Sequence, residues 1–481
     1  MNKKPPVIMW FRQDLRLRDN PAFSSARQTK LPIVFVYIWS DEDRNPWSMG
    51  GASRWWLHQS LHALEAQLLK RGTALIIRRG DSLSSLTTLV QETNATAVYW
   101  NRRYDPHGRA DDLQIKRTLQ TMDIPVHDYN GSLLIDPDQL TNKTGHPYQV
   151  FTPFWRRYQT ETFKTFRNAV PTQLPALGKR LDSVSLDKLN LEPTIDWTKG
   201  IRSTWTPGET DALRRLKTFI RTQCISYEHG RDRPDQKHTS QLSPYLCFGE
   251  ISPKTIWHEL TAQLDTERER TFHVSAHAFL RQIAWRDFAY HLLYHYPDSP
   301  AQPLREKFSR FRWKENTQLL VSWQKGMTGY PFVDAGMRQL WTTGWMHNRV
   351  RMITASFLTK HLLQPWQRGA EWFWDTLVDA DLANNTMGWQ WVAGCGADAA
   401  PYFRVFNPIT QGIKFDPEGT YIRRWVPELS KLPTPWIHQP WEAPPLLLAE
   451  HQVSLGETYP YPIVEHAEAR TRALKTFAAL K

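Results

Sequence analysis

The chain has 481 residues and a formal net charge of +12, with a pI near 9.5. This length predicts two or three domains, and the basic excess favours a polyanionic partner such as nucleic acid, although a basic solvated surface would give the same charge. Three cysteines without CxxC spacing argue against a disulfide framework or a zinc site and fit a reducing cytosol. The apolar run Val7–Phe11 is too short for a signal sequence or a membrane span.

Residues 1–130 predict alternating strands and helices. Short apolar runs, typical of strands buried on both faces of a parallel sheet, occur at Val7–Phe11, Ile33–Trp39, Ala74–Ile77, Ala97–Trp100 and Val126–Tyr129. A leucine stripe that ends at Gly72 predicts a helix between the second and third runs, and another helix is expected over 106–122. This βαβ series predicts an open, doubly wound sheet. No glycine-rich dinucleotide turn or P-loop occurs, so the fold alone identifies no ligand.

The rest of the chain changes character twice. Residues 131–205 are rich in proline and lack clear periodicity, which predicts a connector over the surface. Residues 206–481 show helical stripes without strand signals and end in a short helix at about 464–480. We therefore expect an α/β domain with a Rossmann-like parallel sheet (1–130), an interdomain connector (131–205) and an all-α domain (206–481).

Tryptophan and arginine are concentrated between Phe279 and Pro408. One stripe at i, i+3, i+4 spacing comprises Gln282, Trp285 and Arg286. A second stripe comprises Trp345, Asn348, Arg349 and Met352, and Trp389 and Trp391 follow in the sequence WQW. A single stripe of this kind is typical of an ordinary core, but together they favour a polar, aromatic pocket with arginines at its rim.

Two further motifs have a plain and a functional interpretation. Asp379 and Asp381 are either solvated carboxylates, or partners of Arg351 and of a cofactor ring N–H. The hydroxyl-rich turn at 239–243 either caps a helix or binds phosphate through its hydroxyls and backbone N–H groups.

Long segments of the chain resemble the photolyase/cryptochrome family, most closely the class I cyclobutane pyrimidine dimer (CPD) photolyases. The segments are WFRQDLRLRDNPAF (10–23), TSQLSPYLCFGEIS (239–252), WQKGMTGYPFVDAGMRQL (323–340), WMHNRVRM (345–352) and GWQWVAGCGADAAPYFRVFNP (388–408). The resemblance covers nearly the whole chain. It implies a deoxyribodipyrimidine photo-lyase, which splits pyrimidine dimers by electron transfer from photoexcited reduced FAD to a flipped-out lesion.

The resemblance implies that the helical domain binds FAD. Residues expected on the diphosphate side are Tyr227, Thr239, Ser240, Gln241, Leu242 and Ser243, where Gln241 stands in place of a relative's Arg. Residues expected around the flavin are Trp345, Arg351, Asp379, Asp381 and Asn385. By the same resemblance Arg351 pairs with Asp379, Asp381 accepts the flavin N3–H, and Asn385 faces flavin N5.

The resemblance also implies an electron relay and a lesion pocket. Trp389, Trp366 and Trp313 align with the tryptophans that carry electrons from the surface, although each alone is also typical of core packing. Trp285 and Trp391 would form aromatic walls against the flipped bases, and base–aromatic stacking contributes roughly 1–3 kcal/mol per base. The arginines expected to hold DNA phosphates are Arg231, Arg286, Arg349 and Arg404.

Gln282 departs from the family pattern, because dimer photolyases have Glu at this position. A carboxylic acid can donate a proton or a strong hydrogen bond to the reduced lesion, whereas Gln retains only an N–H donor. We therefore expect repair with reduced efficiency. Six-four photolyases do have Gln there, but they have His at the positions of Asn348 and Met352, which here are the residues of a dimer photolyase. A cryptochrome-like photoreceptor with little repair is the main alternative, and a six-four enzyme is a distant third.

Partners and location follow from the same resemblance. We expect UV-damaged DNA as the partner, no membrane, no obligate protein partner and a monomer. A cytoplasmic location is expected, associated with the nucleoid if the protein is bacterial. A second antenna chromophore of folate or deazaflavin type is compatible with the α/β domain, where NRRYDPHGR (101–109) lies at the expected position, but its identity stays open.

Overall fold

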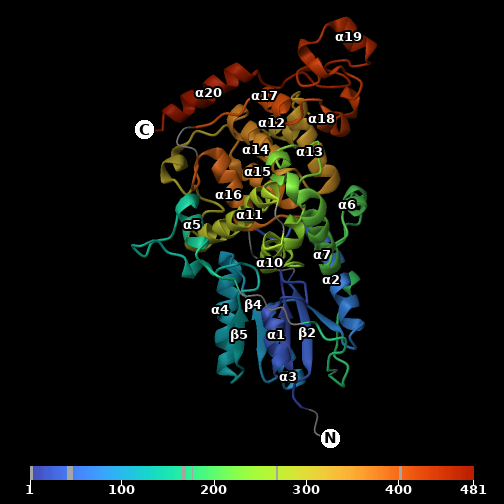
Figure 1. The fold of residues 1–481 in the computed structure, drawn as a ribbon, viewed down its shortest axis with the longest axis vertical. Coiled ribbons are helices and arrows are strands. Elements are labelled where there is room, and N and C mark those ends of the chain that lie inside the picture. Colours follow the sequence, from blue (N-terminus) through green and yellow to red (C-terminus); the bar gives the residue numbers. More distant parts are fainter. Residues whose placement is uncertain are drawn as a thin grey trace. The chain divides into compact units, whose positions relative to one another are not determined.

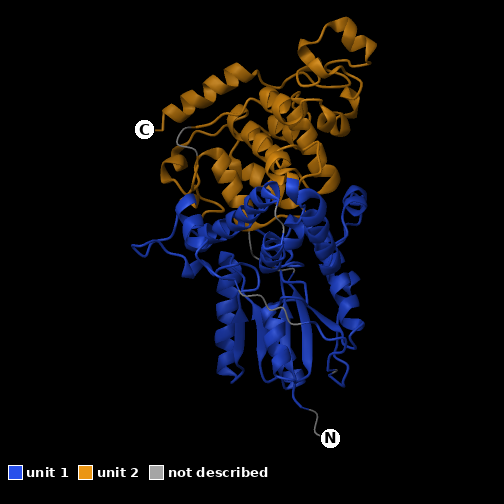
Figure 2. Ribbon diagram, in the orientation of Figure 1, with its two compact units in different colours: residues 1–148, 152–225, 240–297 blue, residues 149–151, 226–239, 298–481 orange. Residues whose placement is uncertain are grey.

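The protein is described from a computed structural model, which covers residues 4–40, 47–163, 169–175, 177–266, 269–399 and 403–480. The chain forms two compact units (Figure 2). Unit 1 comprises residues 1–148, 152–225 and 240–297, and unit 2 comprises residues 149–151, 226–239 and 298–481.

A five-stranded parallel sheet forms the core of unit 1 (Figure 1). Its strands are β1 (Val7–Phe11), β2 (Ile33–Trp39), β3 (Leu75–Arg79), β4 (Val98–Asn101) and β5 (Val126–Tyr129). The strand order is β3-β2-β1-β4-β5. Three of the predicted strands have these bounds, whereas β3 and β4 begin and end one or two residues later than predicted. The apolar run ends at Ile77, but β3 continues through Arg78 and Arg79 because an edge strand can carry charged side chains.

Helices cover both faces of the sheet: α1 (Pro21–Gln28), α2 (Gly51–Leu69), α3 (Ser82–Thr93) and α4 (Pro106–Thr121). Alternate strand residues such as Trp10, Val36 and Trp100 pack against the buried side chains of α3 and α4. The opposite face carries Phe35, whose ring lies 5.7 Å from that of Phe23 on α1. The period of two along each strand therefore gives both faces of the sheet an apolar cover.

The remaining helices of unit 1 follow the sheet in sequence. They are α6 (Lys199–Thr204), α7 (Glu209–Thr218), α9 (Ser243–Cys247), α10 (Pro253–Leu264) and α11 (Arg270–His295), while α5 (Phe151–Tyr158) starts at the unit boundary. The segment around Gly249 joins this part to the loop after β1. Leu15 N donates to Phe248 O at 3.1 Å, and Arg16 donates to Gly249 O at 2.8 Å. These bonds place residues from the predicted helical domain in the same compact unit as the sheet.

Unit 2 is built from helices, and its described part contains no strand. The helices are α8 (Tyr227–Gly230), α12 (Thr317–Gln324), α13 (Pro331–Thr343), α14 (Asn348–Ser356), α15 (Trp366–Thr376), α16 (Leu382–Ala393), α17 (Pro408–Phe415), α18 (Thr420–Trp425), α19 (Pro445–Glu450) and α20 (His466–Ala478). Helix α13 packs against α14 and α18, and α16 packs against both α14 and α15. The predicted fold class, a parallel α/β sheet with a helical C-terminal part, is confirmed.

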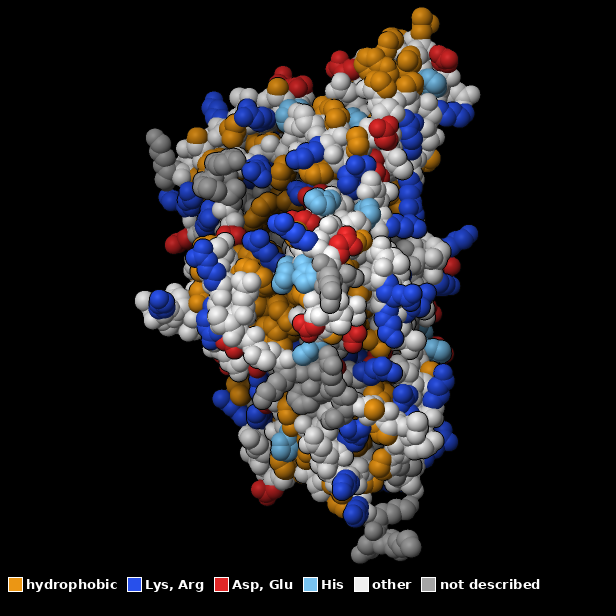
Figure 3. Space-filling view, viewed as in Figure 1, with side chains coloured by type: hydrophobic (Ala, Val, Ile, Leu, Met, Phe, Trp, Pro, Cys, Tyr) orange, Lys and Arg blue, Asp and Glu red, His pale blue; other side chains and the backbone are white. Residues whose placement is uncertain are grey.

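Charged side chains are spread over the surface, and the thiols are buried. On the face drawn in Figure 3, Lys and Arg side chains are spread over both units and mixed with Asp and Glu. All three cysteines, Cys224, Cys247 and Cys395, are buried and free of disulfides. Within the described ranges, no helix is long and apolar enough to cross a bilayer.

Candidate functional site

The contact between α14 and α16 brings together most of the residues predicted around the flavin. Arg351 on α14 donates to both oxygens of Asp379, at 3.0 and 2.8 Å, and its Nε donates to Met346 O at 2.7 Å. The Asp379 side chain is 3% exposed, so this is a partly buried ion pair. Val378 N donates to Gly344 O at 2.8 Å, which holds the acidic segment beside the start of α14. The expected pairing of Arg351 with Asp379 is therefore present.

Asp381 and Asn385 are oriented by the first turn of α16. Asp381 is the N-cap of this helix, and its Oδ1 accepts from Asn384 N at 2.8 Å and from Asn384 Nδ2 at 2.6 Å. Asn385 Nδ2 donates to Ala370 O of α15 at 3.0 Å, which leaves its amide oxygen as an acceptor. N-capping explains why a carboxylate occupies position 381, and the second bond fixes the side chain of Asn385.

Two of the three tryptophans predicted to form an electron relay are buried at the contact of α15 with α16. Trp366 is 1% exposed and Trp389 is 2% exposed. Gly369, one turn after Trp366, leaves room for the Trp389 ring, because a Cβ at Gly369 would lie 2.0 Å from Trp389 Cη2. Trp389 also makes an edge contact with Phe373, at a centroid distance of 5.0 Å. The close packing therefore places both indoles at one helix–helix contact.

Trp313 lies in a loop that is bonded to the segment leading into Trp366. Lys314 N donates to Leu363 O at 2.8 Å, and Gln364 Nε2 donates to Asn316 O at 3.0 Å. The Trp313 ring packs on Phe311 with a centroid distance of 4.3 Å, and its side chain is half-buried. The loop thus brings the third predicted relay residue near the N-terminal end of α15, at a position that solvent reaches.

The predicted lesion-facing residues divide between the units. In unit 1, Gln282 and Trp285 lie on one face of α11; Gln282 Nε2 donates to Ala278 O at 3.3 Å, and Trp285 makes an edge contact with Phe288 at 5.7 Å. In unit 2, Asn348 Nδ2 lies 4.0 Å from Met352 Sδ on α14. Trp391 is half-buried on α16, and Trp345, which was predicted beside the flavin, is 8% exposed.

The four arginines predicted to contact DNA already have neighbours within their own units. Arg349 forms an ion pair with Asp232 at 2.8 Å and lies over the ring of Phe415. Arg286 is 9% exposed and donates to Ser132 O at 2.7 Å. Arg231 lies 6.0 Å from the Tyr227 ring centroid, and Arg404 lies 5.8 Å from that of Phe406. Sequence reasoning missed Asp232, which the motif WMHNRVRM gives no means of finding.

The turn predicted to bind phosphate is also divided at the unit boundary. Tyr227 and Thr239 belong to unit 2, and burial raises the pKa of Tyr227 to about 12. In unit 1, Leu242 N donates to Ser240 Oγ at 3.3 Å and Ser243 begins α9. Gln241 has a left-handed φ of 52°, and its Oε1 accepts from Arg215 at 3.1 Å. Arg215, which sequence reasoning missed, therefore places a guanidinium beside the turn that has Gln in place of Arg.

The carboxyl ends of β1 and β4, where the strand order reverses, are occupied by ion pairs. Arg12 bonds to Asp112 at 3.0 Å, and Arg103 bonds to the same carboxylate at 2.7 Å. Burial alone would raise the pKa of Asp112, but the two guanidinium groups outweigh it and lower the pKa. A cavity lined by Arg12, Asn101 and Tyr104 has a volume of about 20 Å³. Ligand pockets usually measure about 300–1,000 Å³, so this switch point is too small for a second chromophore as it stands.

Histidine 347 is a further buried group beside the predicted pocket residues of α14. It is the N-cap of this helix, because its Nδ1 accepts from Arg349 N at 3.2 Å. Burial lowers the pKa of His347 to about 4, so its imidazole is neutral at pH 7. Among the residues that the structure describes, no group of His, Cys, Asp and Glu has the arrangement of a metal site.

Comparison with known proteins identifies the chain's relatives. A family model described as the FAD binding domain of DNA photolyase matches residues 279–479, and one described as DNA photolyase matches residues 7–176. A deoxyribodipyrimidine photo-lyase of Agrobacterium fabrum is 47% identical, over 100% of this chain and 99% of the relative. The chain belongs to the photolyase/cryptochrome family. It carries the family's FAD-binding domain.

Similar proteins also bear on the predicted subclass of photolyase. The crystal structure of a bacterial class III photolyase from Agrobacterium tumefaciens has a TM-score of 0.94 and 47% identity, covering 100% of this chain and 98% of that one. Cryptochrome-1 of Arabidopsis thaliana is 37% identical, over 97% of this chain and 69% of the relative. The prediction that the chain is most like class I photolyases is wrong, because this similar structure is that of a class III photolyase. The predicted enzyme class, deoxyribodipyrimidine photo-lyase, agrees with the name of the full-length relative.

Proposed function

We propose that the protein is a light-driven DNA repair flavoenzyme that splits cyclobutane pyrimidine dimers in UV-damaged DNA. The packing of α16 against α14 and α15 carries this proposal, because it brings the Arg351–Asp379 ion pair, Asp381, Asn385 and Trp389 together. The FAD-binding family model spans all five of these residues. Relatives named deoxyribodipyrimidine photo-lyase match 96–100% of the chain, which supports the same reaction.

The side chains at this contact suit a flavin ring. Asp381 offers a carboxylate to a ring N–H, Asn385 offers an amide oxygen, and Arg351 is held in place by Asp379 and by a backbone carbonyl. Trp345 and the residues of the 239–243 turn, together with Tyr227, would bind the rest of the cofactor. FAD would supply the absorption of light and the electron that splits the dimer.

The chain's own residues would support this chemistry in two ways. Trp313, half-buried, would accept electrons from solvent-side donors, and the buried Trp366 and Trp389 would pass them inward. Trp285 and Trp391 would stack on the flipped bases, with Asn348 and Met352 contacting their edges and faces. Phosphate contacts would come from Arg231, Arg286, Arg349 and Arg404. The guanidinium of Arg349 would contact a phosphate while it also forms the ion pair with Asp232.

We propose that Gln282 lowers the efficiency of repair. Its side-chain amide already donates to Ala278 O within α11, and an amide has no acidic proton to give to a reduced base. A Glu at the same position would offer a carboxylic acid when protonated. Removing a single strong hydrogen bond made during a reaction typically costs 10²–10³ in rate, which sets an upper bound for the deficit.

A cryptochrome-like photoreceptor is the second candidate. Its support is specific, because plant cryptochromes match this chain at 37–38% identity over 97–99% of its length. Such a protein would retain the flavin residues and the tryptophans and would repair little. A six-four photolyase has less support, because neither position 348 nor position 352 is a histidine.

The test is light-dependent repair of two oligonucleotides, one with a cyclobutane thymine dimer and one with a six-four product. We expect the photoreduced protein to restore the thymine dimer only, and Gln282→Glu to restore it faster, by up to about 100-fold. Gln282→Leu is the matched control, since it keeps the volume and removes every hydrogen bond, and we expect it to be slower than the natural chain.

Each remaining outcome selects another function. No repair of either lesion by the natural chain would reject the enzyme in favour of the photoreceptor. Repair of the six-four product alone would reject the dimer reaction. Equal rates for Gln, Glu and Leu at position 282 would show that this side chain does not limit repair.

A further inference from the structure

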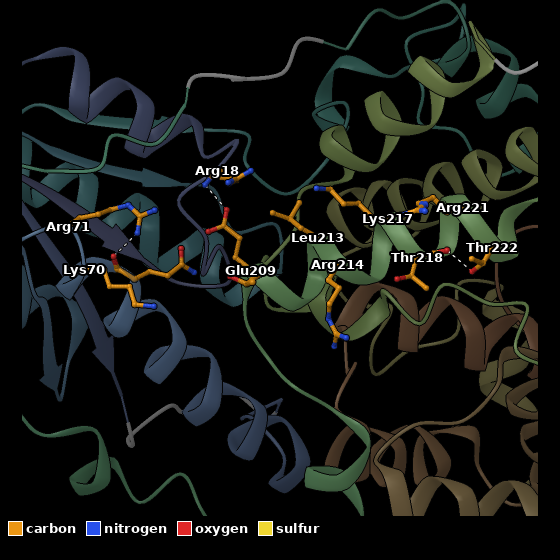
Figure 4. Close-up of a pocket in the computed structure, with 12 residues that line it drawn as sticks. Arg18, Lys70, Arg71, Glu209, Leu213, Arg214, Lys217, Thr218, Arg221 and Thr222 are labelled. Atoms are coloured by element: carbon orange, nitrogen blue, oxygen red, sulfur yellow. Dashed lines mark hydrogen bonds between the residues drawn. The ribbon is translucent and has the colours of Figure 1, made fainter.

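A basic groove lies within unit 1. Its volume is about 680 Å³, and it is lined by the C-terminal end of α2, by α7 with the turn that follows, and by the loop after β1 (Figure 4). Its cationic side chains are Arg18, Lys70, Arg71, Arg214, Lys217 and Arg221. None of the residues proposed for FAD, relay or lesion contacts lines it.

The groove has a large excess of positive charge. The single acidic side chain that lines it is Glu209, which is 4% exposed. The two oxygens of Glu209 accept from the backbone N–H of Arg18 at 2.8 Å and of Leu17 at 3.2 Å. This carboxylate therefore accepts hydrogen bonds from the backbone of the β1–α1 loop. It does not form an ion pair with the cationic side chains of the groove. Of the six cations, Arg214 has a carboxylate partner outside the groove lining, since it donates to Asp211 at 2.9 Å.

Helix capping does not account for the arrangement. Lys70 and Arg71 follow the last turn of α2, where cations are favoured by the helix dipole. The other cations come from separate elements, and Arg214, Lys217 and Arg221 are spaced i, i+3, i+7, which places them on one face of α7 and the turn after it. Lys217 and Arg221 are exposed, and within the described part of the chain neither has a carboxylate partner.

The spacing of this row suits a chain of phosphates. Seven residues of helix rise by about 10 Å. One strand of duplex DNA carries a charge for every 3.4 Å or so of helix axis, so this length corresponds to about three phosphate-to-phosphate steps of one strand. The residues that line the groove in the described structure include no aromatic side chain, and Leu213 is the one large apolar group among them. A base would find no ring to stack on, so the groove suits a backbone and does not read bases.

We propose that this groove binds the sugar–phosphate backbone of DNA, independently of any lesion. Such a contact adds a sequence-independent and salt-dependent contribution to DNA affinity. It would let the protein hold undamaged DNA through one surface while another set of residues engages a dimer. The inference does not rest on the repair reaction, because it concerns binding to undamaged DNA in the dark.

The test compares two double variants of the full chain for binding to an undamaged 20-base-pair duplex, in the dark, between 50 and 300 mM salt. The groove variant is Lys217→Gln with Arg221→Gln. The control is Arg117→Gln with Lys199→Gln, which removes the same charge from exposed positions of α4 and α6 that do not line the groove. Fluorescence anisotropy gives the affinity at each salt concentration. All four positions are exposed, so loss of the fold is not expected, and circular dichroism checks it.

For the groove variant we expect the slope of log K against log salt to shrink by about 1.8, and the affinity at 0.1 M salt to fall about 50-fold. The control should change the affinity less than about threefold and leave the slope unaltered. Equal losses in both variants would overturn the proposal, because the charge would then act only as a diffuse field. A third measurement uses inorganic tripolyphosphate: if it binds the natural chain and not the groove variant, while both bind DNA with the same slope, the groove holds a free polyphosphate and not DNA.

Discussion

At the scale of single residues, the buried carboxyl group of Glu250 in unit 1 shows how burial and hydrogen bonding together determine whether a side chain is charged. Glu250 is 0% exposed and accepts from Trp56 Nε1 at 3.2 Å and from Ser60 Oγ at 2.5 Å. Burial raises the pKa of Glu250 to about 8, against the effect of these two hydrogen bonds. The group is therefore mainly protonated at neutral pH, and it ties the 240–297 segment to α2.

The raised pKa of Glu250 predicts how the free energy of unfolding changes with pH. Because the folded state holds the Glu250 proton up to about pH 8 and the unfolded state releases it near pH 4.5, the stability from this group is complete at low pH and is lost as pH rises towards 8. The loss is about 1.4 kcal/mol for each pH unit in that window. We expect Glu250→Gln to remove this loss, so that its urea midpoint falls less than that of the natural chain between pH 5 and pH 8.

Glu450→Gln is the control for this experiment, since it removes an exposed carboxylate at the end of α19. It should follow the pH profile of the natural chain. If Glu250→Gln also follows that profile, Glu250 is ionised in the folded state and the assignment of its proton is wrong.

At the scale of elements, the contact of α15 with α16 depends on a glycine. A methyl group at Gly369 would meet the ring of Trp389 at 2.0 Å, while a methyl group at Gly388 on α16 would meet nothing within 4 Å. We expect Gly369→Ala to lower the free energy of unfolding by about 1–3 kcal/mol, because overpacking displaces the indole or the helix. Gly388→Ala should be neutral or stabilise by up to about 1 kcal/mol, since alanine is the better helix former.

Thermal unfolding of the two variants measures this difference directly. Steady illumination with blue light gives a second reading, the rate of flavin photoreduction, which should fall for Gly369→Ala and stay unchanged for Gly388→Ala. A slower rate in both variants would mean that the packing of Trp389 does not control the relay.

Elements with continuous apolar runs could be predicted from the sequence, and others could not. Val7–Phe11 and Ile33–Trp39 have the predicted bounds because both faces of these strands are buried. The end of β3 was wrong by two residues, since Arg78 and Arg79 lie on an edge strand. Helix α5 was missed within the proline-rich connector, where Phe151–Tyr158 has its own short apolar stripe.

In the candidate site, too, some contacts could be predicted from the sequence and others could not. The pairing of Arg351 with Asp379 was predicted from the family resemblance and is present. The ion pair of Arg349 with Asp232 and the bond from Arg215 to Gln241 were not predicted, because their partners are 117 and 26 residues apart in the chain. Spacing along a helix indicates which residues share a face, but it says nothing about what packs opposite.

At the scale of the whole molecule, the two compact units do not follow the order of the chain. Gly249 explains part of this, because it lies against the backbone of the loop after β1. A Cβ at Gly249 would lie 2.1 Å from Gln13 O, and the residue has a left-handed φ of +63°. Residues 240–297 therefore stay with the sheet, although the sequence predicted them as part of a separate helical domain.

We expect Gly249→Ala to destabilise unit 1 as a whole, lowering hydrogen-exchange protection in α11 and in the sheet together. Gly145→Ala is the matched control, because Gly145 also has a left-handed φ, +80°, but no atom lies within 4 Å of its Cβ position. Left-handed strain costs about 1–2 kcal/mol at either site, so the excess loss at Gly249 measures the close approach. Protection lost in α11 alone would show that the two segments unfold independently.

The buried cysteines have a practical consequence. Burial raises the pKa of Cys224 and of Cys395 to about 12, so almost no thiolate is present at neutral pH, and Cys247 is also buried. Maleimides and oxidants react with the exposed thiolate. The natural chain therefore offers no reactive thiol of its own to a labelling reagent. One cysteine introduced at Thr218, an exposed and uncharged residue of the groove lining, would carry the only dye on the folded protein, and the emission of that dye would report, molecule by molecule, when DNA enters the basic groove.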